Sequence, residues 1–519
     1  MADMLTKTDL QSYLQCPRKL WLERHRPELA PADDSMAYRR AVDGNIVGEK
    51  AREQLGRSFI WPPSTADRSK TIAEAARLLR DSRGVAAAEF PMMYAGLYAR
   101  ADALIPDGDR YILRETKAST FPLKLDGVTP KAPKEDHLND LAIQAWVMSN
   151  GGPPLGRSEL NLLDNRWRYP GEDDYSGLFR QMDVSAEVAV RMENIPGWLD
   201  GATRVVEGEM PKTHTGKHCT QPYSCSFFDF CRPLDPAGPE HPIELLPDSA
   251  GKKLAGRLRE TKGYVSILDP GPDELTGAQS ELYCRIQEAH RNNREARAPG
   301  AEAIIAAYPY PRYYFDFEGI DLPVPRWRGV RPYEQIPFQW SCHIERRPGV
   351  YEHGEFLDLT GNDPSLGCVL RMKEVINLDD SGPIFVYHAT YEKGRLEGLA
   401  ERHPEHAEFL TNYIARLVDL LPLVKNYYYH PQMRGSFSIK KVLPVVAPDL
   451  NYDELDEVQE GTGAQVAYIE AALNPDTAPA RKTDLELKLR TYCRQDTWAM
   501  VEIAYFLAQS GRPTRPSGM

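Results

Sequence analysis

The stretch that decides the fold is YARADALIPDGDRYILRETKAS, residues 98–119 of a chain of 519 residues. It predicts a β-hairpin, because the turn signal PDGD (106–109) separates two apolar runs. Side chains two apart on a strand share a face, so Glu115 and Lys117 point the same way and the neighbouring strand brings Asp102 beside them. Two carboxylates and an amine are costly to bury together unless a cation joins them. The hairpin therefore predicts a divalent-metal site with a lysine beside it.

This order of an aspartate, a hairpin and a Glu-x-Lys pair resembles the PD-(D/E)XK nuclease superfamily, in particular its RecB-like branch. The segment DHLNDLAIQAWVM predicts a helix, and the resemblance makes its Gln144 a further catalytic residue. An earlier helix, GNIVGEKAREQL, puts Glu49 where such folds often offer another acid, so the resemblance implies that Glu49 is a metal ligand. An isolated Glu-x-Lys pair is more often a solvated strand end, but here its context favours the nuclease.

The length of the chain predicts two or more domains, each with its own core. The formal net charge is −12, which argues weakly against a large nucleic-acid surface but leaves room for local basic patches. The chain has no run of eighteen apolar residues, and its first residues, MADMLTKTDL, have no apolar signal core. We therefore expect a cytoplasmic protein that does not associate with membranes.

Four of the eight cysteines form a spaced set. Residues 5–25 predict a helix that Pro17 kinks or breaks, and Cys16 lies at that break. Cys219, Cys225 and Cys231 follow much later, each separated from the next by five residues. In a cytosolic chain clustered thiols bind metal more often than they form disulfides. Four thiolates hold either zinc or an iron–sulphur cluster, and composition does not separate the two.

One early cysteine followed by a late triplet resembles the iron–sulphur clasp of RecB-like nucleases, in which the cluster ties the two ends of the nuclease domain together. The resemblance implies a [4Fe–4S] cluster bound by Cys16, Cys219, Cys225 and Cys231, with zinc as the alternative. The commoner family spacing begins the triplet with a gap of two residues, whereas this chain has five.

A second site begins with the aromatic strand YYFDFEG, on which Asp316 and Glu318 alternate out to one face. This pair resembles the first motif of the DEDD exonucleases, which have the ribonuclease-H-like fold. The later segment HATYE takes the place of the family's Asn-x-x-Phe-Asp motif, which makes Glu392 the third acid, with Asp419 as the fallback for that role.

The last motif lies in the helix YCRQDTWAMVEIAYFL, where Tyr492 and Asp496 are four residues apart and share a face. This spacing resembles the tyrosine subtype of the DEDD exonucleases. The resemblance implies that the acids hold two Mg²⁺ or Mn²⁺ ions and that Tyr492 helps to place the attacking water.

The C-terminal part also resembles a bacterial family known only as a domain of unknown function, in which such a domain follows a RecB-like one. We therefore expect an α/β chain in three parts. These are a PD-(D/E)XK nuclease domain at 1–240, a helical connector at 241–305 and a ribonuclease-H-like exonuclease domain at 306–519. The motifs fall in separate blocks, so we expect each nuclease domain to fold and bind metal alone.

The function predicted from the sequence is a nuclease with two separate sites that hydrolyse phosphodiester bonds of DNA, which we favour over RNA. The alternative is a nucleic-acid-binding or structural subunit of a repair or defence complex, for example beside a helicase, in which one or both sites are inactive. The acidic net charge and the glutamate at 392 favour that alternative.

Overall fold

The chain folds into two compact units, as the computed structural model shows. The model describes residues 4–31, 35–56, 58–63, 67–82, 84–377, 380–450, 457–458 and 461–515. The first unit comprises Met1–Ala237 with Leu322–Glu334, and the second comprises Gly238–Asp321 with Gln335–Met519. Both contain mixed sheets and helices, so the α/β class is confirmed.

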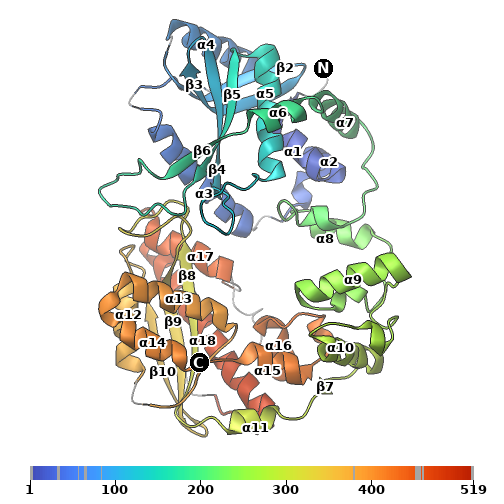
Figure 1. The fold of residues 1–519 in the computed structure, drawn as a ribbon, viewed down its shortest axis with the longest axis vertical. Helices are drawn as coiled ribbons and strands as arrows, with labels where there is room; N and C mark the ends of the chain where they lie inside the picture. Colours follow the sequence, from blue (N-terminus) through green and yellow to red (C-terminus); the bar gives the residue numbers. More distant parts are fainter. Residues whose placement is uncertain are drawn as a thin grey trace. The chain divides into compact units, whose positions relative to one another are not determined.

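The first unit is built on a six-stranded mixed sheet covered by helices (Figure 1). Its strands are β1 (Leu5–Thr6), β2 (Ala87–Tyr94), β3 (Leu97–Asp107), β4 (Arg110–Thr120), β5 (Leu155–Leu163) and β6 (Phe179–Asp183). Its helices are α1 (Lys7–Gln15), α2 (Pro17–His25), α3 (Ser35–Glu53), α4 (Arg68–Asp81), α5 (Glu135–Gly151), α6 (Ser185–Met192), α7 (Ile195–Glu207) and α8 (Phe228–Cys231). The expected hairpin is confirmed as the antiparallel pair β3–β4, and the helix break at Pro17 is confirmed as the junction of α1 and α2.

On one edge, strand β3 pairs with both β1 and β4, and this arrangement determines where the first candidate site lies. Strand β2 pairs along the opposite edge, from Ala87↔Leu104 to Tyr94↔Leu97. On the site edge β4 pairs only as far as Ala103↔Arg114, whereas the short β1 pairs in parallel with Leu97 and Tyr98. The edge is therefore split between β1 and β4, and the side chains that follow each strand end can meet at the split.

The second unit is built on a five-stranded sheet with the order β10-β9-β8-β11-β12. Its strands are β7 (Ala296–Arg297), β8 (Arg312–Asp321), β9 (Gln335–Arg347), β10 (Val350–Leu357), β11 (Ile384–Val386), β12 (Leu417–Asp419) and β13 (Tyr428–Tyr429). Its helices are α9 (Asp248–Lys262), α10 (Ser280–Asn292), α11 (Ala301–Ala306), α12 (Ser365–Val375), α13 (Ala389–Arg402), α14 (Ala407–Ala415), α15 (Leu420–Tyr427), α16 (Ile439–Val446), α17 (Gly461–Tyr468) and α18 (Pro479–Leu507). Strands β8, β9 and β10 are antiparallel, whereas β11 and β12 continue the sheet in parallel with β8.

The two faces of this sheet carry different side chains because β9 alternates with period two. Trp340, Cys342 and Ile344 enter an apolar core with residues of α12, α13 and α14, the helices drawn over β9 and β10 in Figure 1. Ser341 and His343 point to the other face, where both contact Thr497 of α18. Helix α18 therefore covers the face of the sheet opposite to α12–α14.

The described boundaries differ from the expected ones in two ways. Residues 241–305, expected as a connector, are grouped with the second unit. Conversely, the thirteen residues Leu322–Glu334, between β8 and β9, are grouped with the first unit. Val324 packs in a small core with Val47 of α3, and Tyr333 donates a hydrogen bond of 2.7 Å to the carbonyl of Ala118. We call this segment the strap. The first unit is thus not continuous in sequence, and residues 1–240 alone lack the strap.

Tyr333→Ala is expected to destabilise the first unit by about 2–3 kcal/mol, because it removes a half-buried ring and a hydrogen bond to the strand that carries Lys117. Tyr333→Phe keeps the ring and is expected to cost only about 1 kcal/mol. Hydrogen-exchange mass spectrometry of peptides from β4 measures both. If neither variant changed exchange in β4, the strap would not stabilise the first unit.

None of the helices in the described ranges combines the length and the apolar character needed to cross a membrane.

Candidate active sites

Three carboxylates meet on the α18 face of the second sheet. Asp316 and Glu318 are two apart on β8, and Asp496 reaches them from α18. One ligand oxygen from each lies within 4.8 Å of the other two. Glu318 and Asp496 are buried, and Asp316 is half-buried. The expected acids from opposite ends of the unit thus converge on a point where a divalent cation could bind.

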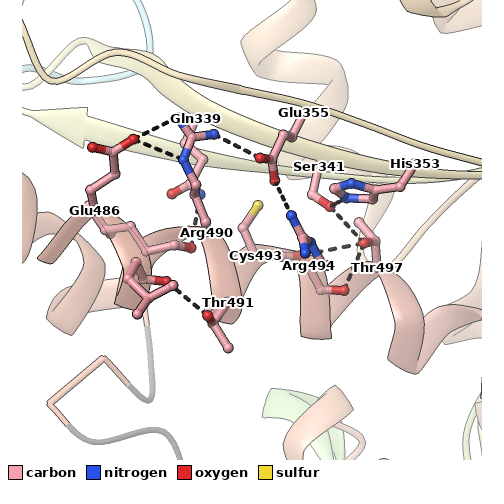
Figure 2. A network of polar contacts seen from close by, with 12 residues as sticks. Gln339, Ser341, His353, Glu355, Glu486, Arg490, Thr491, Cys493, Arg494 and Thr497 are labelled. Carbon is pink, nitrogen blue, oxygen red and sulfur yellow. Dashed lines mark hydrogen bonds and ion pairs between the residues drawn. The ribbon is translucent and has the colours of Figure 1, made fainter. Parts of the chain in front are cut away.

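Polar contacts fix α18 against the sheet and so place its acid (Figure 2). The Thr497 hydroxyl contacts the Ser341 hydroxyl of β9 at 2.9 Å. One turn earlier, Arg494 donates to Glu355 of β10 at 3.1 Å. Because Asp496 lies between these two anchored residues in sequence, its rotation about the helix axis is fixed towards β8.

Glu392 is the fourth acid of this group. It lies in the first turn of α13, only 1 % of its surface is exposed, and its carboxylate interacts with Asp316. Its Oε2 atom is buried and has no hydrogen-bond partner. A buried carboxylate oxygen without a partner is costly unless a cation binds it. The set of four acids therefore fits a site for divalent ions.

Asp419, the fallback for the third acid, has a different role. Its carboxylate accepts hydrogen bonds of 2.9 Å from the backbone N–H groups of His388, Ala389 and Leu421. His388 is held with φ at 79°, a left-handed conformation that non-glycine residues rarely adopt. Asp419 therefore fixes the start of α13, and through it the position of Glu392, rather than serving as a ligand itself.

These acids lie close together with too little positive charge nearby to neutralise them. Burial, and then the neighbouring Asp496, raise the pKa of Asp316 well above its usual range. Burial, and then Asp316, do the same to the pKa of Glu318. Lys440 acts against both shifts, and its ammonium lies 5.2 Å from the centre of the Tyr492 ring. Tyr492 lies one turn before Asp496 on α18 and faces this same Lys440.

Asp316→Asn is expected to stabilise the metal-free protein, and more so as the pH rises. Because the pKa of Asp316 is raised, the folded chain keeps a proton that the unfolded chain releases. Wild-type stability is therefore lost as the pH rises above about 4 towards the raised pKa, whereas asparagine does not titrate. Urea unfolding of both proteins in EDTA, between about pH 5 and pH 8, measures the difference. A difference that shrinks with rising pH would contradict the raised pKa.

In the first unit, the expected residues also lie together. The Lys117 ammonium is 2.8 Å from Glu115 Oε1, and the Gln144 amide on α5 donates to Glu115 Oε2 at 2.7 Å. Asp102 on β3 accepts from the backbone N–H of Thr116 at 2.8 Å. The hairpin thus brings an aspartate, a glutamate and a lysine to one point, and the helix adds the glutamine.

Two further charged residues at this point were not predicted from the sequence. Asp140 lies one turn before Gln144 on α5, is 1 % exposed and forms an ion pair with Lys117. Lys7, the first residue of α1, lies 3.2 Å from Glu115 Oε1 and 3.0 Å from Asp140 Oδ1. The four-residue spacing to Gln144 could have indicated Asp140, but no local signal indicates Lys7.

Glu49, expected as a metal ligand, is not at this site. Its side chain is exposed on α3, and it is absent from the wall of the adjoining cavity. The α3 residues that line that wall are Gly44, Asn45, Val47, Gly48, Ala51 and Arg52. Successive helix residues turn by about 100°, so Glu49 points well away from the face that Gly48 and its neighbours form.

Burial dominates the charges of the first site. It raises the pKa of Glu115 to about 7, with Asp102 and Asp140 acting in the same direction. Burial alone would raise the pKa of Asp140 too, but Lys117 and Lys7 hold it well below its usual range. Asp140 is therefore the permanent anion between two ammonium groups, while Glu115 takes up or releases a proton near neutral pH.

Two cavities adjoin Lys117. One of about 300 Å³ is lined by Asp102, Glu115 and Lys117 together with residues of α3. A larger one of about 770 Å³ is lined by Lys117, by polar residues of α1 and the start of α5, and by the loop that contains Tyr223. The smaller cavity thus opens onto the acids themselves, whereas the larger one reaches the site only through Lys117.

The four clasp cysteines line one small pocket. Cys16, at the break between α1 and α2, faces Cys219, Cys225 and Cys231 there. The Gln15 amide joins the two segments by donating to the carbonyls of His218 at 2.9 Å and Tyr223 at 2.7 Å. Residues more than two hundred positions apart thus meet around the thiols.

In the residues that the structure describes, these four thiols are not close enough together to form a ready-made zinc site. A tetrahedral zinc site with Zn–S bonds of about 2.3 Å holds its sulphurs about 3.8 Å apart. In the part of the chain that is described, no three of the cysteine sulphurs lie within 4.8 Å of one another. Arg18 Nη1 is buried beside them without a hydrogen-bond partner, as suits a thiolate or sulphide acceptor.

The comparison with protein families matches a range that lies mostly in the second unit. A family model described as "Domain of unknown function (DUF2779)" matches residues 313–438. The matched range includes Asp316, Glu318 and Glu392 and ends before Asp496.

Two curated relatives are themselves uncharacterised. The chain is 25% identical over 214 residues to "Uncharacterized protein MG366" of Mycoplasma genitalium, a match covering 38% of this chain and 32% of that one. It is 26% identical over 243 residues to "Uncharacterized protein UU173" of Ureaplasma parvum serovar 3, covering 42% of this chain and 34% of that one. The matches thus span about a third of the length of these relatives.

Among solved structures, "Crystal structure of SSO0001" is similar at 16% identity with a TM-score of 0.24. That match covers 44% of this chain and 87% of the solved one.

Proposed function

We propose that this protein is a metal-dependent nuclease with two separate sites, one in each unit, that hydrolyse phosphodiester bonds. The observation that carries the proposal is the meeting of Asp316, Glu318 and Asp496 within 4.8 Å, with Glu392, whose buried Oε2 atom has no hydrogen-bond partner, beside them. Four acids from two strand positions and two helices have no structural reason to share one buried place, since burying their charges without a cation destabilises the fold.

For the second unit we propose a DEDD-type exonuclease with the ribonuclease-H-like fold. The sheet supports this reading: three antiparallel strands are followed by two parallel ones, and the acids lie on the first strand and on the last helix. Asp316, Glu318, Glu392 and Asp496 would hold two Mg²⁺ or Mn²⁺ ions. When bound, such ions activate water and stabilise the leaving oxygen. Tyr492, beside Lys440, orients the nucleophile or the phosphate.

For the first unit we propose a RecB-like PD-(D/E)XK nuclease. The antiparallel hairpin β3–β4, the parallel pairing of β4 with β5, and α5 between them support this reading. Asp102 and Glu115 would hold the metal. Lys117 neutralises the phosphate or positions water, and Gln144 fixes the Glu115 carboxylate through its 2.7 Å hydrogen bond.

We further propose that the four clasp cysteines hold a [4Fe–4S] cluster with a structural role, because they join α1 and α2 to the end of the first unit. The cluster supplies cross-links between distant segments. Arg18 and Lys19 line the same pocket, and their charges offset those of the thiolates.

The test uses purified full-length protein with end-labelled single- and double-stranded DNA and RNA, in Mn²⁺, in Mg²⁺ and in EDTA. We expect metal-dependent shortening of at least one DNA substrate. Glu115→Gln and Asp496→Asn should each reduce it, whereas Glu49→Gln and Asp484→Asn are matched controls on α3 and α18 that should not. Binding without cleavage under every condition would favour the alternative of a nucleic-acid-binding subunit in a larger complex.

A further inference from the structure

The backbone on both sides of Lys7 is fixed by secondary structure. The parallel pairing of Leu5 and Thr6 with β3 fixes the backbone immediately before it. Thr6 then caps α1 in a reciprocal capping box with Asp9, so the first helical turn is rigid as well. Because β1 occupies the same edge of β3 as β4, the side chain that follows β1 is directed to the split edge where the acids of the first site lie.

The Lys7 ammonium joins the same two acids as Lys117. It contacts Glu115 Oε1 at 3.2 Å and Asp140 Oδ1 at 3.0 Å. Lys117 contacts Glu115 Oε1 at 2.8 Å and pairs with Asp140 Oδ2. The Gln144 amide donates to Glu115 Oε2. Each oxygen of these two carboxylates therefore already has a nitrogen partner in the described structure.

A divalent ion would bind the same carboxylate oxygens that these nitrogen atoms contact. Mg²⁺, Mn²⁺ and Ca²⁺ bind carboxylate oxygens directly, at about 2.0–2.6 Å. A metal that binds Glu115 Oε1 must therefore displace an ammonium group from it. Lys117 is held more closely and shares β4 with Glu115, whereas Lys7 comes from another element and makes the longer contact. Lys7 is thus the cation that is easier to displace.

Charge leads to the same conclusion. When all three are ionised, Asp102, Glu115 and Asp140 carry three negative charges beside the two ammonium groups of Lys7 and Lys117, which leaves one net negative charge among these five groups. A bound divalent ion would make the net charge of this group positive unless one of the two ammonium groups moved away. The flexible four-carbon stem of lysine allows such a movement while its backbone stays in place.

We propose that Lys7 is a built-in counter-ion of the first site, which a divalent metal displaces and which therefore sets the metal concentration at which the site fills. This inference rests on the proposed metal site at Asp102 and Glu115. It assigns to Lys7 a positioning role on the acids.

The first test measures Mn²⁺ binding by electron paramagnetic resonance in the full chain carrying Asp316→Asn and Asp496→Asn, which disable the second site. Lys7→Met is expected to lower the Kd for Mn²⁺ at least tenfold. The substitution removes the competing positive charge and keeps a side chain of similar length. Lys7→Arg keeps the charge and should bind like the parent. Lys134→Met, in the wall of the larger cavity, is the matched control and should not change the Kd. Equal or weaker Mn²⁺ binding by Lys7→Met would overturn the inference.

A second test needs no variant of Lys7. Amine labelling of the parent protein, read by mass spectrometry, should increase at Lys7 when Mn²⁺ is added, because the ammonium leaves the carboxylates. Labelling at Lys134 should stay constant. Protection of Lys7 by Mn²⁺, or no change, would overturn the inference even if Lys7→Met failed to fold.

These outcomes are separate from those of the proposed function, because metal binding is read without substrate. If Mn²⁺ bound equally to the parent and to Lys7→Met, only the role of Lys7 would be wrong. If no Mn²⁺ bound to the parent, and Glu115→Gln changed nothing, both the metal site and the role of Lys7 would be wrong.

Discussion

Asp496→Asn is expected to reduce cleavage by the second unit about a thousandfold, since a lost ligand costs several kcal/mol of transition-state stabilisation. The same substitution should stabilise the metal-free protein, because Asp496 raises the pKa of Asp316 by repulsion. Activity and stability thus change in opposite directions, as expected for acids gathered for catalysis. The rate is measured on a labelled oligonucleotide in Mn²⁺, in a Glu115→Gln background that silences the first site.

Asp419→Ala is the informative contrast to this variant. Asp419 accepts two backbone hydrogen bonds at the start of α13 and one at the start of α15, so its loss should lower the free energy of unfolding by about 1–2 kcal/mol. Asp484→Asn, on the same helix as Asp496 but paired with Arg481 and Lys488, should leave cleavage unchanged. If Asp419→Ala abolished cleavage with unchanged stability while Glu392→Gln spared it, Asp419 would be the third acid.

Cys225→Ser is expected to lose the metal of the clasp and to unfold the first unit at a markedly lower temperature. Binding at structural thiolate sites is folding free energy, on the order of 10 kcal/mol in small zinc domains. Here the clasp joins segments that are also linked by the two hydrogen bonds from Gln15 and by the packing of Leu22 against Phe227. Without metal, burial raises the pKa of the Cys225 thiol, so the protein keeps it protonated and gains no thiolate contacts.

Iron and acid-labile sulphide, measured per chain after anaerobic purification, check this prediction together with thermal unfolding. Wild-type protein should be brown and contain about four of each. Cys284→Ser, on α10 outside the clasp, is the matched control and should keep both the colour and the unfolding temperature. Colourless wild-type protein that contains one zinc ion per chain would show that the clasp binds zinc instead of an iron–sulphur cluster.

Much of the two candidate sites could be predicted from the sequence because their residues follow local periodicities. The period of two on β4 and β8 placed Glu115 beside Lys117 and Asp316 beside Glu318. The spacing of four on α18 placed Tyr492 near Asp496.

Three residues show the limit of such reasoning. Lys7 lies more than a hundred positions from Glu115, and only the pairing of β1 with β3 brings them together. The four-residue spacing to Gln144 could indicate that Asp140 lies on the same face of the helix. Its ion pairs with Lys7 and Lys117 depend on the tertiary fold. Glu49 lies on the expected helix, but the rotation of α3 is set by tertiary packing, and its side chain is exposed.

The strap shows the same limit at the level of domains. Nothing in the residues between β8 and β9 indicates that thirteen of them contribute to another unit, because Val324 and Tyr333 read as ordinary loop residues. Their assignment depends on packing against Val47 and Ala118, far away in sequence. The separate expression of residues 1–240 would therefore omit part of the first unit.

The central claim is that each unit contains its own phosphodiester-cleaving site, and one experiment tests it most directly. The rate of Mn²⁺-dependent cleavage is measured for the wild type, for Glu115→Gln, for Asp496→Asn and for the double variant, on the same labelled DNA. Two independent sites predict that each single variant keeps the activity of the other site and that the double variant is inactive. Wild-type cleavage by the double variant would contradict the claim.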